Sequence, residues 1–237
     1  MNIRSKKIIY LSFVGILLGS CSSNTSELEK VEQNESLEII QTSFRMEMGG
    51  LLDQTQITIE HSLTSGLEDL KCDSTYNKEV EESFLFNEGT AAVNGVLRYT
   101  MECGDFDSPE QIRFYLATGK RCENPRISSE EIASFKGGIT GLDLGEDEWI
   151  FQGSYSSSAT SQLLVKAKKW VDTKIQWTLT EIRINKHTGE IQSGLGSYHL
   201  EGDISGSTFS KSGNIEIRED GTAILVVDGT SFIIDWK

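Results

Sequence analysis

The side chains that could do chemistry in this sequence are three histidines and many carboxylates. His61 alternates with the apolar residues of a predicted strand, His187 lies in a predicted turn, and His199 is flanked by an aromatic and an aliphatic residue. A histidine in line with the apolar face of a strand is typical of a packed or edge residue, and a catalytic base is the alternative for His61. The sequence contains neither the GxSxG of a nucleophile elbow nor the GxxxxGK[ST] of a phosphate-binding loop. We therefore predict no catalytic residues.

The carboxylates are densest in a glycine-flanked turn that contains Asp143, Glu146, Asp147 and Glu148. These side chains could supply the oxygen ligands that calcium prefers, but their spacing is not that of an EF-hand loop. Acidic residues between two strands are more often solvated. Two carboxylates that hydrolyse a glycosidic bond can be recognised only by their separation in the fold. We predict no metal ion and no cofactor.

Aromatic side chains on predicted strands are the remaining candidates for a binding site. An exposed ring on a β-sheet can hold a sugar ring or a peptide. Trp170 shares its face of a predicted strand with Lys166 and Lys168, which indicates exposure. We take Trp170 and Tyr198 as possible ligand-facing aromatic residues, with core packing as the alternative for Trp170.

The N-terminus has the order of charge, apolar length and small residues that marks an export signal. Three basic residues precede an apolar run over residues 8–18, and the letters LGS lead directly to Cys21. The run is too short to cross a bilayer as a helix. It resembles the lipobox of bacterial lipoproteins, which implies that residues 1–20 are removed and that Cys21 carries lipid. An ordinary signal peptide is the alternative.

The rest of the chain is strongly acidic. The net charge is −14, and because the first 20 residues carry three basic and no acidic side chains, the remaining 217 residues carry −17. Such a surface repels phosphate backbones and anionic headgroups, so we expect no nucleic-acid partner and attachment to the membrane only through lipid. Residues 21–38 contain no aromatic side chain and are expected to form a flexible tether.

Three cysteines remain after Cys21, and in an exported chain they indicate one disulfide and one leftover thiol. Cys103 and Cys122 bracket a predicted loop and a predicted strand. We favour a disulfide between them, with a pairing of Cys72 as the alternative. A zinc site lacks the necessary CxxC or HxxxH spacing.

The fold class follows from short alternating segments separated by glycine-bearing turns. Twenty-two glycines and only two prolines suit many tight turns, and most segments from residue 96 onward alternate with a period of two. We expect strands at 39–48, where a helical stripe is the alternative, and at 56–63. Ser128 and Glu131 have capping-box spacing, which predicts one short helix over 128–135. The predicted class is an all-β antiparallel sandwich or barrel-like domain.

An internal similarity suggests how the domain is organised. GTAAVNGVLRYTMECG, from Gly89, aligns with GEIQSGLGSYHLEG, from Gly189, through matching glycine, tyrosine and glutamate positions. We expect a first β unit over 39–155 and a second over 156–237, with one continuous domain as the alternative.

The C-terminal half resembles a group of exported lipoproteins of Bacteroidetes-type bacteria that has no established activity. The resemblance lies in ITGLDLGEDEWIFQGSY, in the run from SGLGSYHLEG to SFIIDWK, and in NPRISSEE. It covers about the last 120 residues and implies no reaction. Asp73-Ser74-Thr75 also matches the short O-glycosylation pattern of that group, so Ser74 is a possible modification site.

These features together favour an envelope-anchored lipoprotein with a non-catalytic β-rich domain in a binding or structural role. The expected location is the bacterial outer membrane, facing the periplasm or the cell surface, and the expected partner is a glycan or another envelope protein. The alternative is a glycosidase-like hydrolase of an extracellular polymer that uses carboxylates from the acid-rich loops.

Overall fold

A computed structural model describes residues 35–63, 70–86, 89–143, 145–164, 169–204 and 206–236. Cys21, the expected signal peptide and most of the expected tether lie outside this part of the chain. Residues 35–44 are helical and are followed by η1 (Met46–Met48) and α2 (Leu51–Leu63). The strands within the described residues are β1 (Thr75–Phe86), β2 (Gly89–Cys103), β3 (Pro109–Glu123), β4 (Ile127–Thr140), β5 (Glu148–Leu163), β6 (Trp170–Asn185), β7 (Ile191–Ile204), β8 (Ser207–Ile217), β9 (Thr222–Val227) and β10 (Thr230–Asp235).

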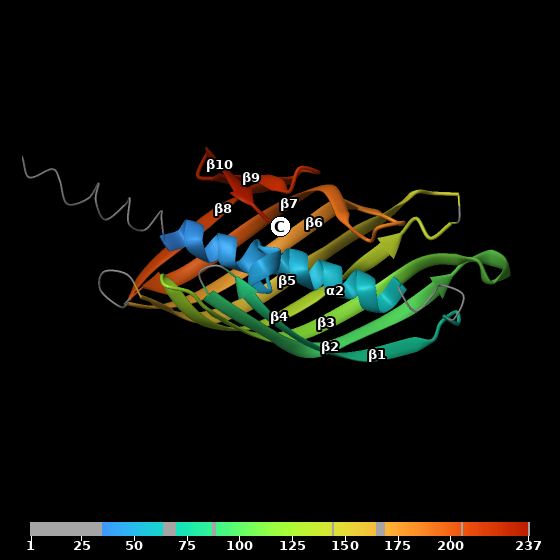
Figure 1. Cartoon of the computed structure of the whole chain (residues 1–237), viewed down its shortest axis with the longest axis horizontal. Helices are drawn as coiled ribbons and strands as arrows, with labels where there is room; N and C mark the ends of the chain where they lie inside the picture. The colour runs from blue at the N-terminus through green and yellow to red at the C-terminus, as the bar shows by residue number, and fades with distance from the viewer. Residues whose placement is uncertain are drawn as a thin grey trace, which may run out of the picture. The chain divides into compact units, whose positions relative to one another are not determined.

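The described strands form one antiparallel sheet in which each strand pairs with the next along the chain, from β1 to β10. The predicted all-β class is confirmed. Figure 1 shows the sheet curving around the helical segments, with α2 lying across its concave side. Residue 155, the expected end of a first β unit, lies inside β5, and the same sheet continues through both expected units.

The two faces of the sheet differ in what covers them. On the inner face, which carries the helices, alternate residues of every central strand are buried. Phe114, Phe135 and Phe151 stack there at ring-centroid distances of 4.9–5.3 Å. Trp177 lies nearby between Phe44 of the N-terminal helical segment and Tyr198. Most side chains of the outer face are exposed.

The helices lie where the sequence predicted strands, and the predicted helix is a strand. Residues 35–44 are helical, and Ser36, at the end of the expected tether, is buried. The capping-box reading of Ser128 and Glu131 is wrong, because both residues lie in β4. The same letters alternate with a period of two, so that Ile127, Glu131 and Phe135 all point to the inner face.

Buried hydroxyl groups are compatible with the helical conformation of residues 51–63. Thr55, Thr58 and Ser62 donate hydrogen bonds to backbone carbonyls one turn earlier, at 2.5–2.8 Å. A hydroxyl satisfied by its own helix can be buried without another partner. The alternation of Ile57 and Ile59 predicts a strand because Thr58 and Ser62 fall on the opposite, polar face of that pattern.

The disulfide joins Cys72 to Cys103, so the favoured pairing of Cys103 with Cys122 is wrong and the alternative with Cys72 is confirmed. Cys122 is buried and free. The error has a simple cause: Cys103 ends β2 and Cys122 lies near the far end of β3. A strand between two cysteines separates them by its length, here roughly 40 Å. Cys72 instead precedes β1, the partner of β2.

Among the described residues, the helices are too short or too polar to span a membrane.

Candidate functional site

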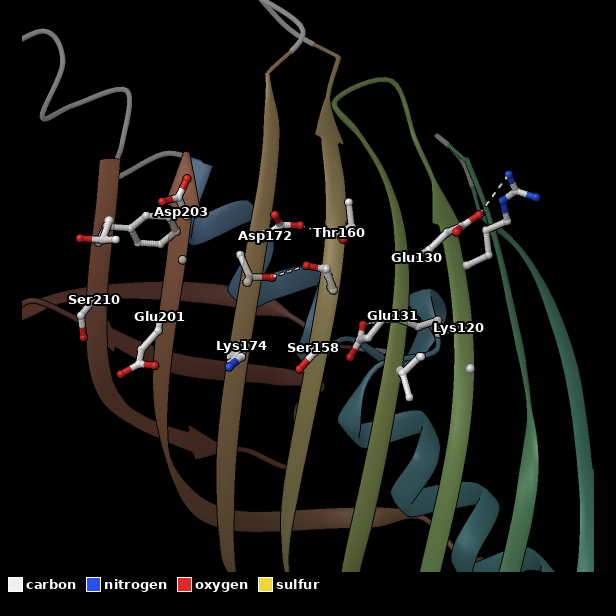
Figure 2. A pocket seen from close by; sticks show the side chains of 18 of the residues that line it. Lys120, Glu130, Glu131, Ser158, Thr160, Asp172, Lys174, Glu201, Asp203 and Ser210 are labelled. Atoms are coloured by element: carbon white, nitrogen blue, oxygen red, sulfur yellow. Dashed lines mark hydrogen bonds and ion pairs between the residues drawn. The ribbon is translucent and has the colours of Figure 1, made fainter. Parts of the chain in front are cut away.

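A hollow of about 1360 Å³ lies on the outer face, opposite the helices and near one end of the sheet. Seven adjacent strands, β2 to β8, line it, so at a strand spacing of about 4.8 Å it extends over roughly 29 Å. Figure 2 shows its side chains projecting from neighbouring strands. The hollow is long and open, and its dimensions suit an extended ligand that lies across the strands.

Strand register arranges the lining side chains of the outer face in two cross-strand rows. The inner row lies farther from the strand ends than the outer row. The inner row consists of Asn94, Gly119, Ile132, Ser158, Lys174, Glu201 and Ser210. The outer row, nearer the strand ends, consists of Ala92, Arg121, Glu130, Thr160, Asp172, Asp203 and Thr208. In the middle of the two rows, β5 contributes the short side chains Ser158 and Thr160.

The hollow offers many hydrogen-bonding groups and a modest negative charge. Four carboxylates face two cations, Arg121 and Lys174, within the two rows. Arg121 forms an ion pair with Glu130 at 3.5 Å, and the Thr160 hydroxyl donates to Asp172 at 2.8 Å (Figure 2). The two rows contain one large apolar side chain, Ile132, which is 77% exposed. Hydroxyl, amide and carboxylate groups therefore dominate the surface that a ligand would meet.

Trp170 lies on the outer face of β6 two residues before Asp172, which lines the hollow. Its side chain is 59% exposed, as the sequence predicted. Alternate residues of a strand share a face and lie about 7 Å apart, so the indole stands at the edge of the hollow, next to the outer row on β6. Tyr198, the other aromatic residue expected to face a ligand, is only 4% exposed and packs against Trp177, so that expectation is wrong.

Behind the floor of the hollow, the inner face carries a buried ion pair. Lys120 Nζ and Glu131 Oε2 are 2.6 Å apart, and both side chains are almost completely buried. Lys120 also donates to the backbone carbonyl of Thr42 at 3.2 Å, and the Tyr155 hydroxyl donates to Glu131. Thr42 lies in the last turn of the helical segment 35–44. The ammonium thus satisfies a free carbonyl at a helix C-terminus, where positive charge is stabilising.

The ion pair fixes the charge states of its members. Burial alone would raise the pKa of Glu131, but the Lys120 charge and the hydrogen bonds from Lys120 and Tyr155 hold it below its ordinary value. Burial, followed by the negative charge of Glu131, raises the pKa of Tyr155 well above its ordinary value. Glu131 is therefore ionised and Tyr155 protonated near neutral pH.

Further contacts attach the helical segment 35–44 to the same strands. Arg126 and Glu38 form an ion pair at 3.1 Å, and Trp177 donates through its indole nitrogen to Ser43 at 3.2 Å. Polar bonds, together with apolar residues such as Ile40, thus hold this segment against the sheet. The helical segment 35–44 therefore packs against the face of the sheet opposite the hollow.

Asp53, on α2, is a second buried acid on the helix side of the sheet. Burial, and then the negative charges of Glu82 and Glu60, raise its pKa to about 7, while the Lys120 charge lowers it. One carboxylate oxygen, Oδ2, is buried and has no hydrogen-bond partner among the described residues. The ionised form of Asp53 is therefore disfavoured in the folded protein.

The sequence contains a signal for the buried ion pair in the alternating pattern of β3. In β3, Lys120 continues the alternating series that begins with Ile112, Phe114 and Leu116. A charged residue on the buried face of a strand needs a buried partner of opposite charge. Once β4 is recognised as a strand, Glu131 is the acid on its inner face directly opposite Lys120.

The remaining candidate residues lie apart from the hollow or are exposed. Within the described part of the chain, no group of three histidine, cysteine or acidic side chains is placed to hold a metal. The acid-rich turn between β4 and β5 is tied to basic residues, because Lys186 donates to the Asp143 carbonyl at 2.6 Å and Arg183 pairs with Glu148 at 2.8 Å. Ser74 lies in the turn before β1 and is half-buried.

The histidines make no catalytic arrangement among the described contacts. His61 is half-buried in α2. His187 and Asp147 are 3.9 Å apart, and each lies in an exposed turn. His199 contacts Glu201 at 3.2 Å on the outer face, beside the hollow.

Comparisons of the chain with protein-family models, with curated proteins and with solved structures find no match. The function therefore has to be inferred from the chemistry of the hollow and its rim.

Proposed function

We propose that this protein is a lipid-anchored binding protein of the bacterial outer membrane, and that its outer-face hollow binds a glycan chain without cleaving it. The observation that supports this most is the composition of the hollow. Hydroxyl, amide and carboxylate side chains line it, and an exposed tryptophan, Trp170, stands at its edge. Sugar hydroxyls both donate and accept hydrogen bonds, and a sugar ring can lie flat on an indole.

The same composition argues against two other ligand classes. The core of a protein–protein interface is usually apolar and rich in aromatic residues, whereas the rows contain Ile132 as their large apolar side chain. Four carboxylates against two cations disfavour an acidic polymer such as a phosphate-rich or uronic-acid glycan. The ligand that fits best is a neutral glycan, in an extended conformation across the strands.

The anchor and location rest on the sequence. The charged start, the apolar run and the letters LGSC favour lipid attachment at Cys21, and the following acidic residues favour a tether rather than adsorption to the bilayer. Two or three acyl chains on one residue would hold the domain at a membrane. The domain then faces either the periplasm or the cell surface.

Binding is tested with a panel of neutral, amino-sugar and acidic polysaccharides in affinity electrophoresis and calorimetry. We expect at least one neutral polysaccharide to bind. Trp170→Ala, and Ser158→Trp in the middle of the hollow, should each weaken that binding at least tenfold. Ile233→Ala changes an exposed apolar residue on β10, away from the hollow, and should leave it unchanged. Equal loss in all three variants, or a preference for acidic polysaccharides, would contradict the proposal.

Hydrolysis is tested in the same samples. Release of new reducing ends from the bound polysaccharide would identify a glycosidase and overturn the non-catalytic part of the proposal. The anchor is tested separately by fractionating cells that make the Cys21→Ala variant. The variant should leave the membrane fraction, and a variant that stays there would contradict lipid attachment.

A further inference from the structure

The tip of the β2–β3 hairpin presents a phenylalanine to solvent. Cys103 ends β2, Gly104 follows, and Asp105-Phe106-Asp107 forms the short helical turn η3 before β3 begins at Pro109. Phe106 is fully exposed, and a phenylalanine ring is among the largest apolar surfaces that one residue can offer. The green loop at the right-hand end of Figure 1 is this tip.

The backbone of the tip is unfavourable for the residue that occupies it. Phe106 has φ 62° and Asp107 has φ 59°, both in the left-handed region. Glycine or asparagine is the usual occupant of such a position, and a bulky residue there is uncommon. Phe106 makes no ring contact with the described aromatic residues, and its full exposure means that it adds nothing to the core. Neither local conformation nor packing accounts for a phenylalanine at this position.

Two backbone hydrogen bonds and a disulfide restrain the tip despite its exposure. The Gly104 N–H donates to the Ser108 carbonyl at 2.9 Å, and the Ser108 N–H donates to Asp105 at 3.4 Å. Directly before the tip, the disulfide between Cys103 and Cys72 fastens the end of β2 to the segment that precedes β1. A fixed loop loses little conformational entropy on binding, which favours recognition of another molecule.

The charges around the ring indicate the kind of partner. Asp105 and Asp107 flank Phe106, and Glu110 lies beside Gly104. The nearest cation in β3, Arg113, is paired with Glu102 at 2.7 Å. Insertion of the ring into a lipid surface would bring the two aspartates to anionic headgroups, which repel them. A second copy of the chain would bring the same acidic groups together.

We propose that Asp105-Phe106-Asp107 is a docking site for a partner protein that offers an apolar pocket rimmed by arginine or lysine side chains. Phe106 fills the pocket, and the two aspartates pair with the rim. This site is separate from the proposed glycan hollow. The hollow begins at Ala92 and Asn94, near the start of β2, whereas the tip follows the last residue of that strand.

The first test is photo-crosslinking in the cells that make the protein, with the full chain and a benzophenone amino acid at position 106. The control carries the same group at position 85, because Leu85 is also exposed. Leu85 pairs with Thr90 at the start of β2, so it lies at the opposite end of that strand from the tip. We expect one discrete protein adduct from position 106 and none from position 85. The same adduct should disappear when Asp105 and Asp107 are both changed to lysine.

The protein in the adduct is then purified, and its affinity is measured directly. Phe106→Gly should weaken binding about thirtyfold or more, as expected for a central apolar anchor. The same variant should melt at an equal or higher temperature, because glycine accepts the left-handed backbone. Loss of binding with unchanged stability would separate docking from folding, and Leu85→Ala should bind as the unchanged protein does.

Several outcomes would overturn the proposal. Adducts only to lipid, or no adduct above that from position 85, would exclude a protein partner. An adduct with twice the mass of the chain would identify a second copy instead. An adduct that survives the double lysine change would exclude the basic rim, and unchanged affinity in Phe106→Gly would exclude the ring as the anchor.

Discussion

Replacing Lys120 with methionine should destabilise the protein strongly, because Glu131 would then be buried without a partner of opposite charge. Lys120 and Glu131 are 2.6 Å apart and almost completely buried, and methionine fills a similar volume without the charge. Removing one member of a buried ion pair costs about 3–5 kcal/mol, because the remaining charge has lost its partner. Lys120→Met also leaves the Thr42 carbonyl unsatisfied, which adds about 1–3 kcal/mol.

A double-mutant cycle separates the charge interaction from the loss of packing. Glu131→Gln removes the charge and keeps an acceptor for the Tyr155 hydroxyl. The double variant Lys120→Met/Glu131→Gln contains neither charge, so it should be more stable than the sum of the single losses predicts, by about 2–3 kcal/mol. Lys136→Met, an exposed lysine on the same strand as Glu131, is the matched control and should change stability by less than about 0.5 kcal/mol.

The assay is urea unfolding of the purified protein, followed by tryptophan fluorescence and circular dichroism. Trp177 is buried and bonded to Ser43, so its emission reports on the contact between the sheet and the helical segment 35–44. A loss in Lys120→Met no larger than that in the Lys136→Met control would refute the reasoning. Additive losses in the double variant would show that the two charges do not stabilise each other.

Three further changes test other parts of the structure. Because the pKa of Asp53 is raised from 3.8 to about 7, the folded protein binds more protons than the unfolded chain between these values, and the free energy of unfolding should fall as pH rises through this window. Asp53→Asn should remove that slope and raise stability at pH 8 by about 2–4 kcal/mol. A slope that persists would show that another group titrates. Replacing both Cys72 and Cys103 with serine should lower the free energy of unfolding by roughly 3–4 kcal/mol, because the disulfide closes a loop over a separation of 31 residues; urea unfolding measures this loss. In a Cys122 variant, mass spectrometry should show that the disulfide is intact. Gly213→Ala should lower the melting temperature, at a cost of about 1–3 kcal/mol, because the added Cβ would lie 1.8 Å from the Val226 carbonyl oxygen; an unchanged melting temperature would mean that β8 and β9 can separate at no cost.

Glu131 should also make the protein sensitive to acid. Its pKa lies below the ordinary value in the folded state, so its contribution to stability is present above the unfolded pKa and disappears as pH falls through the folded pKa. This loss occurs below about pH 4.5, whereas the Asp53 slope has the opposite sign and extends from about pH 3.8 to about 7. Unfolding measured across both windows should therefore resolve the two acids.

The sequence predicted the strands best where alternation was strong. The segments IRFYLATG and KIQWTLTEIRI lie in β3 and β6, and their apolar residues alternate because one face is buried against the helices. It failed for the helices, since Thr55 and Thr58 are buried by hydrogen bonds to their own backbone, which hydrophobic periodicity does not detect. Ser128 and Glu131 satisfied a capping-box pattern that tertiary packing overrode.

The candidate site could be predicted only in part. Trp170 was identified because its sequence neighbours on the same face are lysines, and exposure of a single side chain can be inferred from its own strand. The hollow could not be found in this way, because its rows combine side chains from seven strands and depend on the register of every pair. Tyr198 shows the same limit, since its burial depends on Trp177 of the neighbouring strand.

Glycan binding in the hollow is tested most directly by an NMR titration of the isotope-labelled protein with the neutral polysaccharide fragment that binds best. We expect amide shifts concentrated at the outer-face rows, around Ile132, Ser158 and Lys174, together with the indole N–H of Trp170. Resonances of the inner face, such as that of Trp177, should not move. Shifts on the inner face or confined to other surfaces, or no shifts with any fragment of the panel, would contradict glycan binding in the hollow.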